Sequence, residues 1–398
     1  MSEVPDTQAR PRLLMVTTVA ATLGGFLLPY ARELRARGWT VEAAAKGATT
    51  DPEVVAAFDA VHELPLSRSI SDVQGMRRSL AALAEVVGDD FDIVHVHTPI
   101  AAFLTRLVVA RMPAGRRPAV VYTAHGFHFH RDGHPVTNLV FSGAEKLAGR
   151  WTDRLVVINH EDRAQAARLR IVPLGHLVEM PGIGVDTTFF SPDQVSPEAM
   201  EAAMAPLAIP AGAPTFVLIG ELNRNKRPMD VVQALASMAD RSAHLVLLGD
   251  GAYRPQVEQT IASAGVGNRV HLLGVVQDVR PYLMAADALI LASKREGLPR
   301  SIMEALSMGV PVISSSARGS TQLVGADAGW VVPTGDVAAM ARAMDQVATD
   351  REAARAAGAH GRDRMVREYD ESVVMALHLQ LYDGLLAGRR RGTRTQAR

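Results

Sequence analysis

The stretch from Ser293 to Ala305 reads SKREGLPRSIMEA and closely follows the apolar run Ala288–Leu291. The apolar run predicts a buried strand, the segment with Gly and Pro predicts a short loop, and a helix is expected to start near Arg300. A helix that begins just after a strand offers unpaired backbone N–H groups and the positive end of its dipole to an anion. The stretch therefore predicts an anion-binding strand–loop–helix unit.

Outward from this unit, short apolar runs alternate with longer helical patterns such as Leu28–Arg37 and Asp72–Val87. Such alternation predicts parallel βαβ units. The strands expected in the first half are Arg12–Thr18, Val41–Ala45, Ile93–His97, Ala119–Thr123 and Leu155–Ile158. Those expected in the second half are Thr215–Ile219, Leu245–Leu248, Val270–Leu273, Ala288–Leu291, Val312–Ser314 and Trp330–Val332.

The two halves are expected to be separate domains, because 398 residues exceed what one hydrophobic core usually serves. The boundary is placed in the loop-like stretch Met180–Asp186, which gives an amino-terminal domain over 1–185 and a carboxyl-terminal domain over 186–369. Ligands of doubly wound sheets bind beyond the carboxyl ends of the strands. We therefore expect two Rossmann-like domains that face a central cleft, with Gly182 and Gly184 as a hinge.

Composition limits the class of function. Lys+Arg and Asp+Glu are both 42, so no net field favours nucleic acid, and hydrophobic content of 48% is that of a globular protein. Cysteine is absent, which excludes thiolate catalysis and fits a cytoplasmic location. The apolar stretch Leu13–Tyr30 superficially resembles a signal peptide, but Gly24, Gly25 and Pro29 interrupt it, and a strand followed by a glycine turn explains it better.

Two carboxylates stand out in the fold-deciding stretch. Glu296 lies in the loop and Glu304 lies eight residues later in the helix. Each carboxylate has two acceptor oxygens, which suit the paired hydroxyls of a sugar or a ribose. The alternative is a solvated loop glutamate beside an unrelated helical one.

Two further loops follow strands. The basic loop Gly220–Pro228 contains Arg224, Lys226 and Arg227, which could neutralise a departing diphosphate, although such a loop is often only surface charge. Gly24 and Gly25 follow the first strand, where glycine lets a backbone approach a phosphate; a plain tight turn is the alternative.

Histidines cluster at two strand ends, with His95 and His97 on one and the run around His125 on the next. They could suggest a metal site, but no carboxylate cluster of ligand spacing accompanies them. We expect His125 to donate hydrogen bonds to a sugar, and His95 and His97 to pack at the strand end.

The run Glu296-Gly297-Leu298-Pro299…Glu304-Ala305…Gly309-Val310-Pro311, with Gly220…Lys226 and His125-Gly126, resembles family-4 retaining glycosyltransferases of the GT-B fold. The resemblance covers about residues 12 to 388, and the amino-terminal half is similar to the branch that builds capsule and exopolysaccharide units. It implies that the helix over 370–388 packs back onto the amino-terminal domain, which leaves 389–398 as a basic disordered tail.

The resemblance also implies roles for individual residues. Glu296 would bond the transferred sugar beside the backbone N–H groups of Gly297 and Leu298, and Glu304 would hold the ribose diol. The other implied donor contacts are Lys226, Gly24 and Gly25 with the diphosphate, and His125 with the sugar near the reacting carbon. This chain has Glu221 where many members have arginine, so Arg224 or Arg227 is a candidate for the missing charge.

The implied reaction transfers a sugar with retention from a nucleotide-sugar, expected to be a UDP-sugar, to a glycan or lipid-linked acceptor. The nucleotide-sugar is substrate, and neither a cofactor nor a divalent metal is expected, since no Asp-x-Asp motif stands out. Alternatives are a nucleotide-sugar epimerase or glycogen-type synthase on this fold, and a non-catalytic sugar-binding protein. A nicotinamide oxidoreductase is disfavoured because no complete G-x-G-x-x-G follows a strand.

A lipid-linked acceptor would bring the protein to the inner face of a membrane. Arg106, Arg111, Arg116 and Arg117, interleaved with apolar residues, together with Arg77 and Arg78, predict a basic and apolar surface compatible with peripheral membrane contact. A merely solvated face is the alternative.

Overall fold

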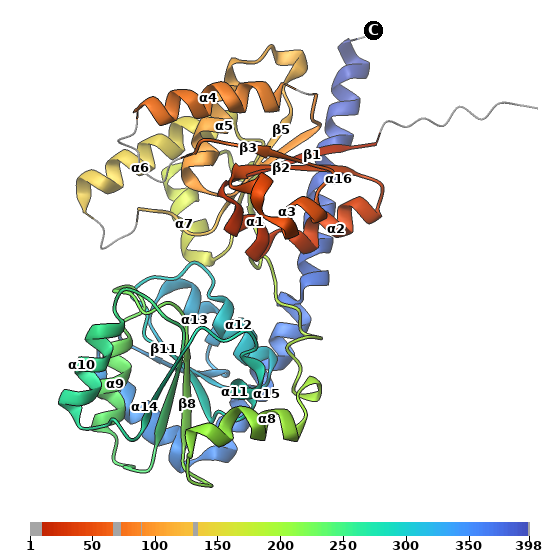
Figure 1. Cartoon of the computed structure of the whole chain (residues 1–398). Helices are drawn as coiled ribbons and strands as arrows, with labels where there is room; N and C mark the ends of the chain where they lie inside the picture. Colours follow the sequence, from red (N-terminus) through yellow and green to blue (C-terminus); the bar gives the residue numbers. More distant parts are fainter. Residues whose placement is uncertain (1–9, 67–72, 89, 130–133, 397–398) are drawn as a thin grey trace, which may run out of the picture. The chain divides into compact units, whose positions relative to one another are not determined.

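The structure is a computed structural model that describes residues 10–66, 73–88, 90–129 and 134–396. The chain divides into two compact units, one formed by residues 1–183 with 375–398 and the other by residues 184–374. The chain thus enters the second unit two residues before the boundary expected from the sequence and returns to the first unit within the last long helix (Figure 1).

Within the described residues, the first unit contains a seven-stranded parallel sheet in the order β3-β2-β1-β4-β5-β6-β7. This is the strand order of a doubly wound Rossmann-like sheet. The strands are β1 (Arg12–Val19), β2 (Thr40–Lys46), β3 (Ala60–Glu63), β4 (Ile93–Val96), β5 (Ala119–Ala124), β6 (Arg154–Val157) and β7 (Leu177–Glu179).

Helices cover both faces of this sheet, and the strand residues alternate between them. Val94 and Val96 of β4 belong to one core cluster with α4, α5 and α7. His95 points to the other face, where it meets Tyr382 of α16. The helices of this unit are α1 (Ala20–Phe26), α2 (Leu28–Ala36), α3 (Pro52–Ala57), α4 (Val73–Val87), α5 (Pro99–Arg111), α6 (Pro135–Ala148), α7 (His160–Leu169) and α16 (Glu371–Gln396).

The second unit repeats the design with a six-stranded parallel sheet in the order β10-β9-β8-β11-β12-β13. Its strands are β8 (Thr215–Ile219), β9 (His244–Leu248), β10 (Val270–Gly274), β11 (Ala288–Leu291), β12 (Val312–Ser315) and β13 (Gly329–Val332). Its helices are α8 (Pro197–Met204), α9 (Pro228–Ser237), α10 (Arg254–Ala264), α11 (Arg280–Met284), α12 (Arg300–Ser307), α13 (Arg318–Val324), α14 (Val337–Thr349) and α15 (Arg351–Arg364).

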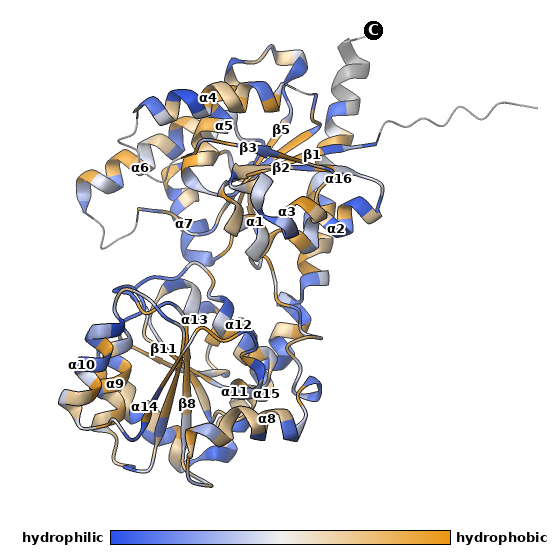
Figure 2. Ribbon diagram, viewed as in Figure 1, coloured by the Kyte–Doolittle hydropathy of each residue, from blue (hydrophilic) through white to orange (hydrophobic). Residues whose placement is uncertain are grey.

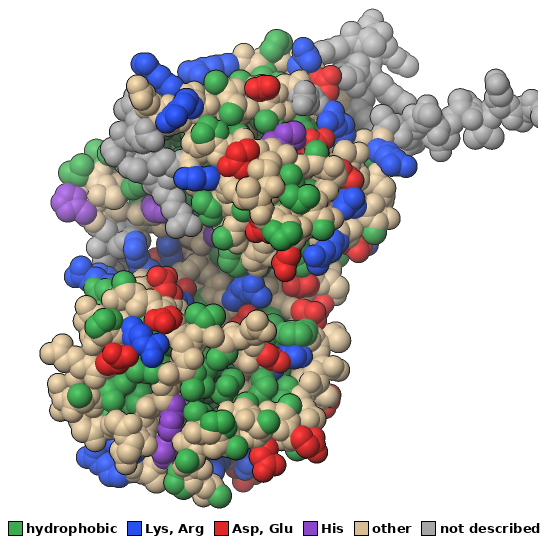
Figure 3. All heavy atoms as spheres, in the orientation of Figure 1, with side chains coloured by type: hydrophobic (Ala, Val, Ile, Leu, Met, Phe, Trp, Pro, Cys, Tyr) green, Lys and Arg blue, Asp and Glu red, His purple; other side chains and the backbone are tan. Residues whose placement is uncertain are grey.

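Hydropathy explains why the central strands form where they do. All residues of β5, β9 and β11 are buried, which is the pattern of parallel strands covered on both faces. The strands of both sheets include many hydrophobic residues (Figure 2). The surface is mixed: on the face shown in Figure 3, basic and acidic side chains are interspersed, in agreement with a formal net charge of +0. The predicted fold of two doubly wound α/β domains is confirmed.

Three local predictions are wrong. The short edge strands β3 and β7 were missed, because the exposed positions of β3 and the brevity of β7 give little apolar signal. Gly24 and Gly25 do not form a turn but lie in α1, where buried Ala20 and Leu23 hold the helix in place. The tail does not lose its structure at residue 389, because α16 continues to Gln396 through arginines, which are good helix formers.

Candidate active site

The clearest site feature of the second unit is an ion pair between two loops that follow strands. Nζ of Lys226, in the loop after β8, lies 2.8 Å from Oε1 of Glu296, in the loop after β11. The side chain of Lys226 is 20% exposed and that of Glu296 is 13% exposed, so the pair is shielded from solvent but a ligand can still reach it. β8 and β11 are neighbours in the sheet, and this adjacency brings together two residues that lie 70 positions apart.

A turn around Asn223 positions Lys226. The Oδ1 atom of Asn223 accepts hydrogen bonds from the backbone N–H groups of Asn225 at 2.9 Å and Lys226 at 3.0 Å. Gly220 adopts a φ of +152°, and a Cβ there would lie 3.3 Å from Cε of Lys226. The lysine side chain therefore passes over a glycine that leaves room for it.

Asn225 ties the two loops together directly. Its Nδ2 donates to the carbonyl of Arg295 at 2.9 Å, and its own carbonyl accepts from the backbone N–H of Lys294 at 2.7 Å. On the far side, Nε of Arg318 donates to the carbonyl of Glu296 at 3.4 Å. The sequence analysis missed Asn223, Asn225 and Arg318, although the position of Arg318 at the start of the helix after β12 repeats the strand–loop–helix pattern.

Glu304 lies where the sequence predicted, inside the helix α12 that begins at Arg300. Its carboxylate is 13% exposed and lies 3.4 Å from the Arg300 guanidinium. Burial raises the pKa of Glu304, and the charge of Arg300 opposes that effect. A shielded carboxylate with one long ion pair retains acceptor capacity for hydroxyl donors.

The other candidates in this unit differ in their surroundings. Arg224 is exposed, and among the described residues its side chain makes no hydrogen bond or ion pair. Arg227 is paired with Asp230 at 2.6 Å, so its charge is already compensated. Gly297 and Leu298 precede α12, and the Gly297 carbonyl touches α13 so closely that a Cβ on Gly319 would lie 1.8 Å from it. That contact fixes the path of the loop that carries Glu296.

In the first unit, His125 follows β5 and stacks against Phe26, with ring centroids 6.2 Å apart. Phe26 ends α1 directly after Gly24 and Gly25. A Cβ on Gly25 would meet no atom within 4 Å, so the backbone there is open to approach. The structure therefore places the glycine pair and His125 at the same carboxyl edge of the first sheet.

A chain of hydrogen bonds continues behind His125. Its Nε2 lies 3.3 Å from Nδ1 of His97, whose own Nε2 is buried without a partner among the described residues. His95 packs in the interior as predicted: its ring nitrogens bond the Tyr382 hydroxyl at 2.6 Å and the Thr123 hydroxyl at 2.7 Å. His97 also contacts His125, which the predicted packing at the strand end did not include.

Burial favours the neutral form of these histidines in the folded protein. Burial lowers the pKa of His125 to about 4, with a further contribution from the charge of His378. Burial likewise holds the pKa values of His95 and His97 well below the usual range, and the neighbouring histidines add to the effect. A neutral imidazole can donate from one nitrogen and accept at the other, so the 3.3 Å contact between His97 and His125 fits a hydrogen bond between two neutral rings.

The described residues contain no group of three or more His, Asp or Glu side chains arranged to hold a metal ion. The same residues contain no helix that is both long and apolar enough to span a bilayer.

One part of the predicted basic surface is wrong. Arg106 is 1% exposed, lies 2.9 Å from Glu145 and stacks over the Tyr122 ring at 4.3 Å, so it is a buried structural residue. Arg117 donates to the carbonyls of Met112 and Ala110 at the end of α5. The sequence could not separate the inward-facing Arg106 from solvated arginines.

Comparison with known proteins identifies the family of this chain. Residues 24–181 match the glycosyl transferase 4-like domain, and residues 213–350 match the glycosyl transferases of group 1. EpsD of Bacillus subtilis, which carries a provisional glycosyltransferase name, is 32% identical over 89% of this chain and 92% of its own length. The UDP-Gal:alpha-D-GlcNAc-diphosphoundecaprenol alpha-1,3-galactosyltransferase of Escherichia coli is 28% identical over 72% of this chain and 74% of its own.

Solved structures share the fold. Anabaena Alr3699/HepE, in complex with UDP and glucose, superposes with a TM-score of 0.80 at 17% identity and covers 94% of this chain and all (100%) of its own. A Rickettsia africae glycosyltransferase gives a TM-score of 0.79 at 18% identity over 95% of this chain and 99% of its own. With the two doubly wound sheets and the Lys226–Glu296 pair at a strand edge, these matches show that the chain belongs to the group 1 glycosyltransferases of the GT-B fold.

Proposed function

We propose that this glycosyltransferase moves a sugar from a UDP-sugar to a glycan or lipid-linked acceptor, with retention at the anomeric carbon and without a divalent metal. The observation that carries the proposal is the shielded pair of Lys226 and Glu296 in the loops after β8 and β11, with Glu304 on the helix that follows. The donor class is supported by relatives and neighbours whose names include UDP or a UDP-sugar.

In this proposal, Lys226 stabilises the negative charge that develops on the departing diphosphate. Glu296 accepts hydrogen bonds from hydroxyls of the transferred sugar, next to the backbone of Gly297 and Leu298, and Glu304 accepts those of the ribose diol. Gly24 and Gly25 bring backbone to the phosphates, and neutral His125 donates to the sugar. The exposed Arg224 supplies an additional cation, whereas Arg227 is already paired with Asp230.

The proposed step needs no covalent intermediate. The oxygen of the acceptor hydroxyl forms a bond to the anomeric carbon on the face that the diphosphate leaves. The bond between that carbon and the diphosphate oxygen breaks with its electron pair going to the diphosphate, which takes the acceptor's proton. The protein contributes positioning and electrostatic stabilisation, and both can be supplied by the charges described above.

The test is a screen of UDP-sugars for thermal stabilisation, followed by a transfer assay with the donor that binds best. Nuclear magnetic resonance of the product should show the anomeric configuration of the donor. Activity should survive exhaustive treatment with a chelator. An inverted product would refute retention, and activity lost to the chelator and restored by one divalent ion would refute metal independence.

A further inference from the structure

A pocket in the first unit lies away from the residues proposed above. Its volume is about 870 Å³, which is within the range of small-molecule sites. Pro118, Asp153 and His176 line it, and each lies just before β5, β6 or β7. The pocket is therefore at the amino ends of these strands, whereas His125 follows the carboxyl end of β5, seven residues after Pro118 and roughly 23 Å away at 3.3 Å per residue.

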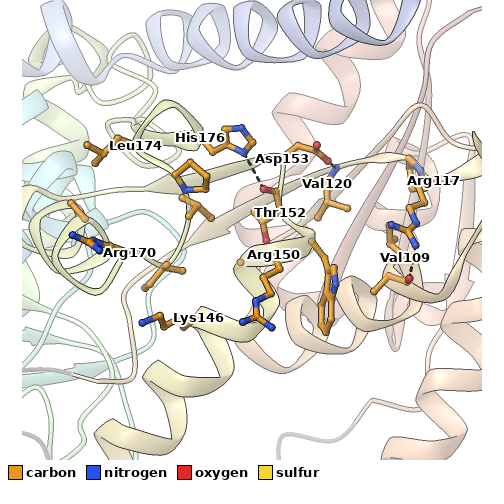
Figure 4. A pocket seen from close by; sticks show the side chains of 18 of the residues that line it. Val109, Arg117, Val120, Lys146, Arg150, Thr152, Asp153, Arg170, Leu174 and His176 are labelled. Atoms are coloured by element: carbon orange, nitrogen blue, oxygen red, sulfur yellow. Dashed lines mark hydrogen bonds between the residues drawn. The ribbon is translucent and has the colours of Figure 1, made fainter. Parts of the chain in front are cut away.

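The charged side chains that line this pocket are mainly basic. Lys146 at the end of α6, Arg150 just after it and Arg170 after α7 all contribute (Figure 4). These three side chains form no ion pair among the described residues. The lining includes one carboxylate, Asp153, and an oxygen of that group accepts the backbone N–H of Val120 at 2.7 Å. We call this site the basic pocket, defined by Lys146, Arg150, Trp151, Arg170 and Leu174.

Apolar side chains line the same pocket. Trp151 is partly exposed, and Leu174 is 72% exposed although it is a large aliphatic residue. One more exposed apolar side chain lies further along α6: Leu139 is seven residues before Lys146 and hence two turns away on the same helical face. Leu139 is 73% exposed. Leu139 therefore lies roughly 10 Å from the lysine along the helix axis, at 1.5 Å per residue.

Backbone features hold this arrangement in place. A Cβ on Gly149 would lie 1.9 Å from the carbonyl of Ile171, so this glycine permits the close approach of the two segments that carry Arg150 and Arg170. Arg170 itself has a φ of +51°, in the left-handed region that glycine or asparagine usually occupies at a helix end. Placing an arginine there costs conformational energy.

From these observations we propose that the basic pocket is a second ligand site, which binds a phosphorylated amphiphile: a phosphate or diphosphate ester of a hydrocarbon chain. The anionic group lies among Lys146, Arg150 and Arg170, which form charge-assisted hydrogen bonds with phosphate oxygens. The hydrocarbon contacts Trp151 and Leu174 and extends along α6 towards Leu139. This site is independent of the proposed sugar donor, because none of its residues lies at the carboxyl edge of the sheet.

Farnesyl diphosphate is a suitable probe, since it combines a diphosphate with a short hydrocarbon chain. Its binding to the full chain is measured by calorimetry in the presence of saturating UDP, and by tryptophan fluorescence. The sequence has three tryptophans, of which Trp151 lines the pocket. We expect saturable binding to one site, with a fluorescence change that disappears in Trp151→Phe.

The double variant Lys146→Glu/Arg170→Glu should weaken binding at least tenfold. Arg168→Glu is the control, because it reverses one charge on α7, half the change of the double variant, at an exposed position outside the pocket lining. It should bind within twofold of the wild type. Lys146→Gln/Arg170→Gln removes the charges without reversing them and keeps the test decisive if the reversed variant is unstable. UDP binding by each variant verifies folding.

Several results would overturn the proposal. Absence of binding, or competition by UDP, would exclude a separate site. An equal loss in Arg168→Glu would show a general charge effect. Pyrophosphate binding as tight as that of farnesyl diphosphate would identify a free phosphate as the ligand and refute the amphiphile.

Discussion

Lys226 and Glu296 neutralise each other across 2.8 Å, although 70 residues separate them in the chain. The pair is anchored on both sides, through the Asn223 turn behind Lys226 and through Asn225 and Arg318 on the backbone around Glu296. In the proposed reaction, a diphosphate competes with Glu296 for the ammonium group. Glu296 is then free to accept hydrogen bonds from sugar hydroxyls, so the ion pair keeps both groups in place before the donor binds.

The first prediction concerns the charge of Lys226. Lys226→Met removes the ammonium group but keeps a long unbranched side chain, and it should weaken UDP binding at least tenfold, or about 1.4 kcal/mol. Turnover should fall further, because charge on the diphosphate increases in the transition state. Arg224→Met is the matched control in the same loop and should have an effect several times smaller. Equal effects in calorimetry with UDP would contradict the assignment of Lys226.

The second prediction separates the two carboxylates. Glu304→Gln should chiefly raise the Kd for UDP, because the amide retains only one acceptor oxygen for a ribose diol. Glu296→Gln should leave UDP binding unchanged or tighter, since it releases Lys226, but should lower kcat at least tenfold. Calorimetry with UDP and steady-state kinetics with the UDP-sugar distinguish them. Wild-type values for both variants would show that neither carboxylate contacts the donor.

The fold could be predicted more fully than the site. Buried central strands such as β8 and β11 were predicted with the bounds they have in the structure, because continuous apolar runs of that length have few alternatives. β3, at the sheet edge, buries little and gave no signal. Gly24 and Gly25 suggested a turn, but packing of buried Leu23 outweighs the helix propensity of glycine.

Within the site, residue type predicted candidates but not their partners. Arg227 pairs with Asp230 only three residues later, a local pair, whereas nothing in the sequence shows that Arg224 stays exposed. Likewise, arginine is usually a surface residue, but Arg106 is buried in the core. The partners of a buried side chain such as Arg106 are determined by tertiary packing, which the local sequence pattern does not encode.

The third prediction tests whether Asn223 positions Lys226. Asn223→Ala removes the oxygen that accepts the N–H groups of Asn225 and Lys226, so the loop should loosen and kcat should fall several-fold with a higher KM. Asn223→Asp retains an acceptor oxygen at the same place and should restore most of the activity. A merely structural role would instead lower the melting temperature of both variants and leave kcat unchanged at temperatures where they are folded.

The last prediction is a loss of stability in acid that arises from the buried histidines of the first unit. In the unfolded chain these groups take up protons below about pH 6.5, whereas the folded-state pKa of His125 is about 4. The unfolded state therefore binds more protons between these pH values, and the free energy of unfolding should fall with acid by about 1.4 kcal/mol per pH unit for each such group. His95 and His97 add to the slope, because their pKa values are lowered as well. Above pH 7 both states are neutral at these positions, so their contribution to the free energy of unfolding no longer changes with pH.

Urea unfolding from pH 7.5 to 4.5 measures this pH dependence. His125→Asn should reduce the slope, while substitution of the exposed His134 by asparagine should not. Identical slopes for wild type and His125→Asn would mean that His125 accepts a proton in the folded protein, and that its bond with His97 does not require two neutral rings.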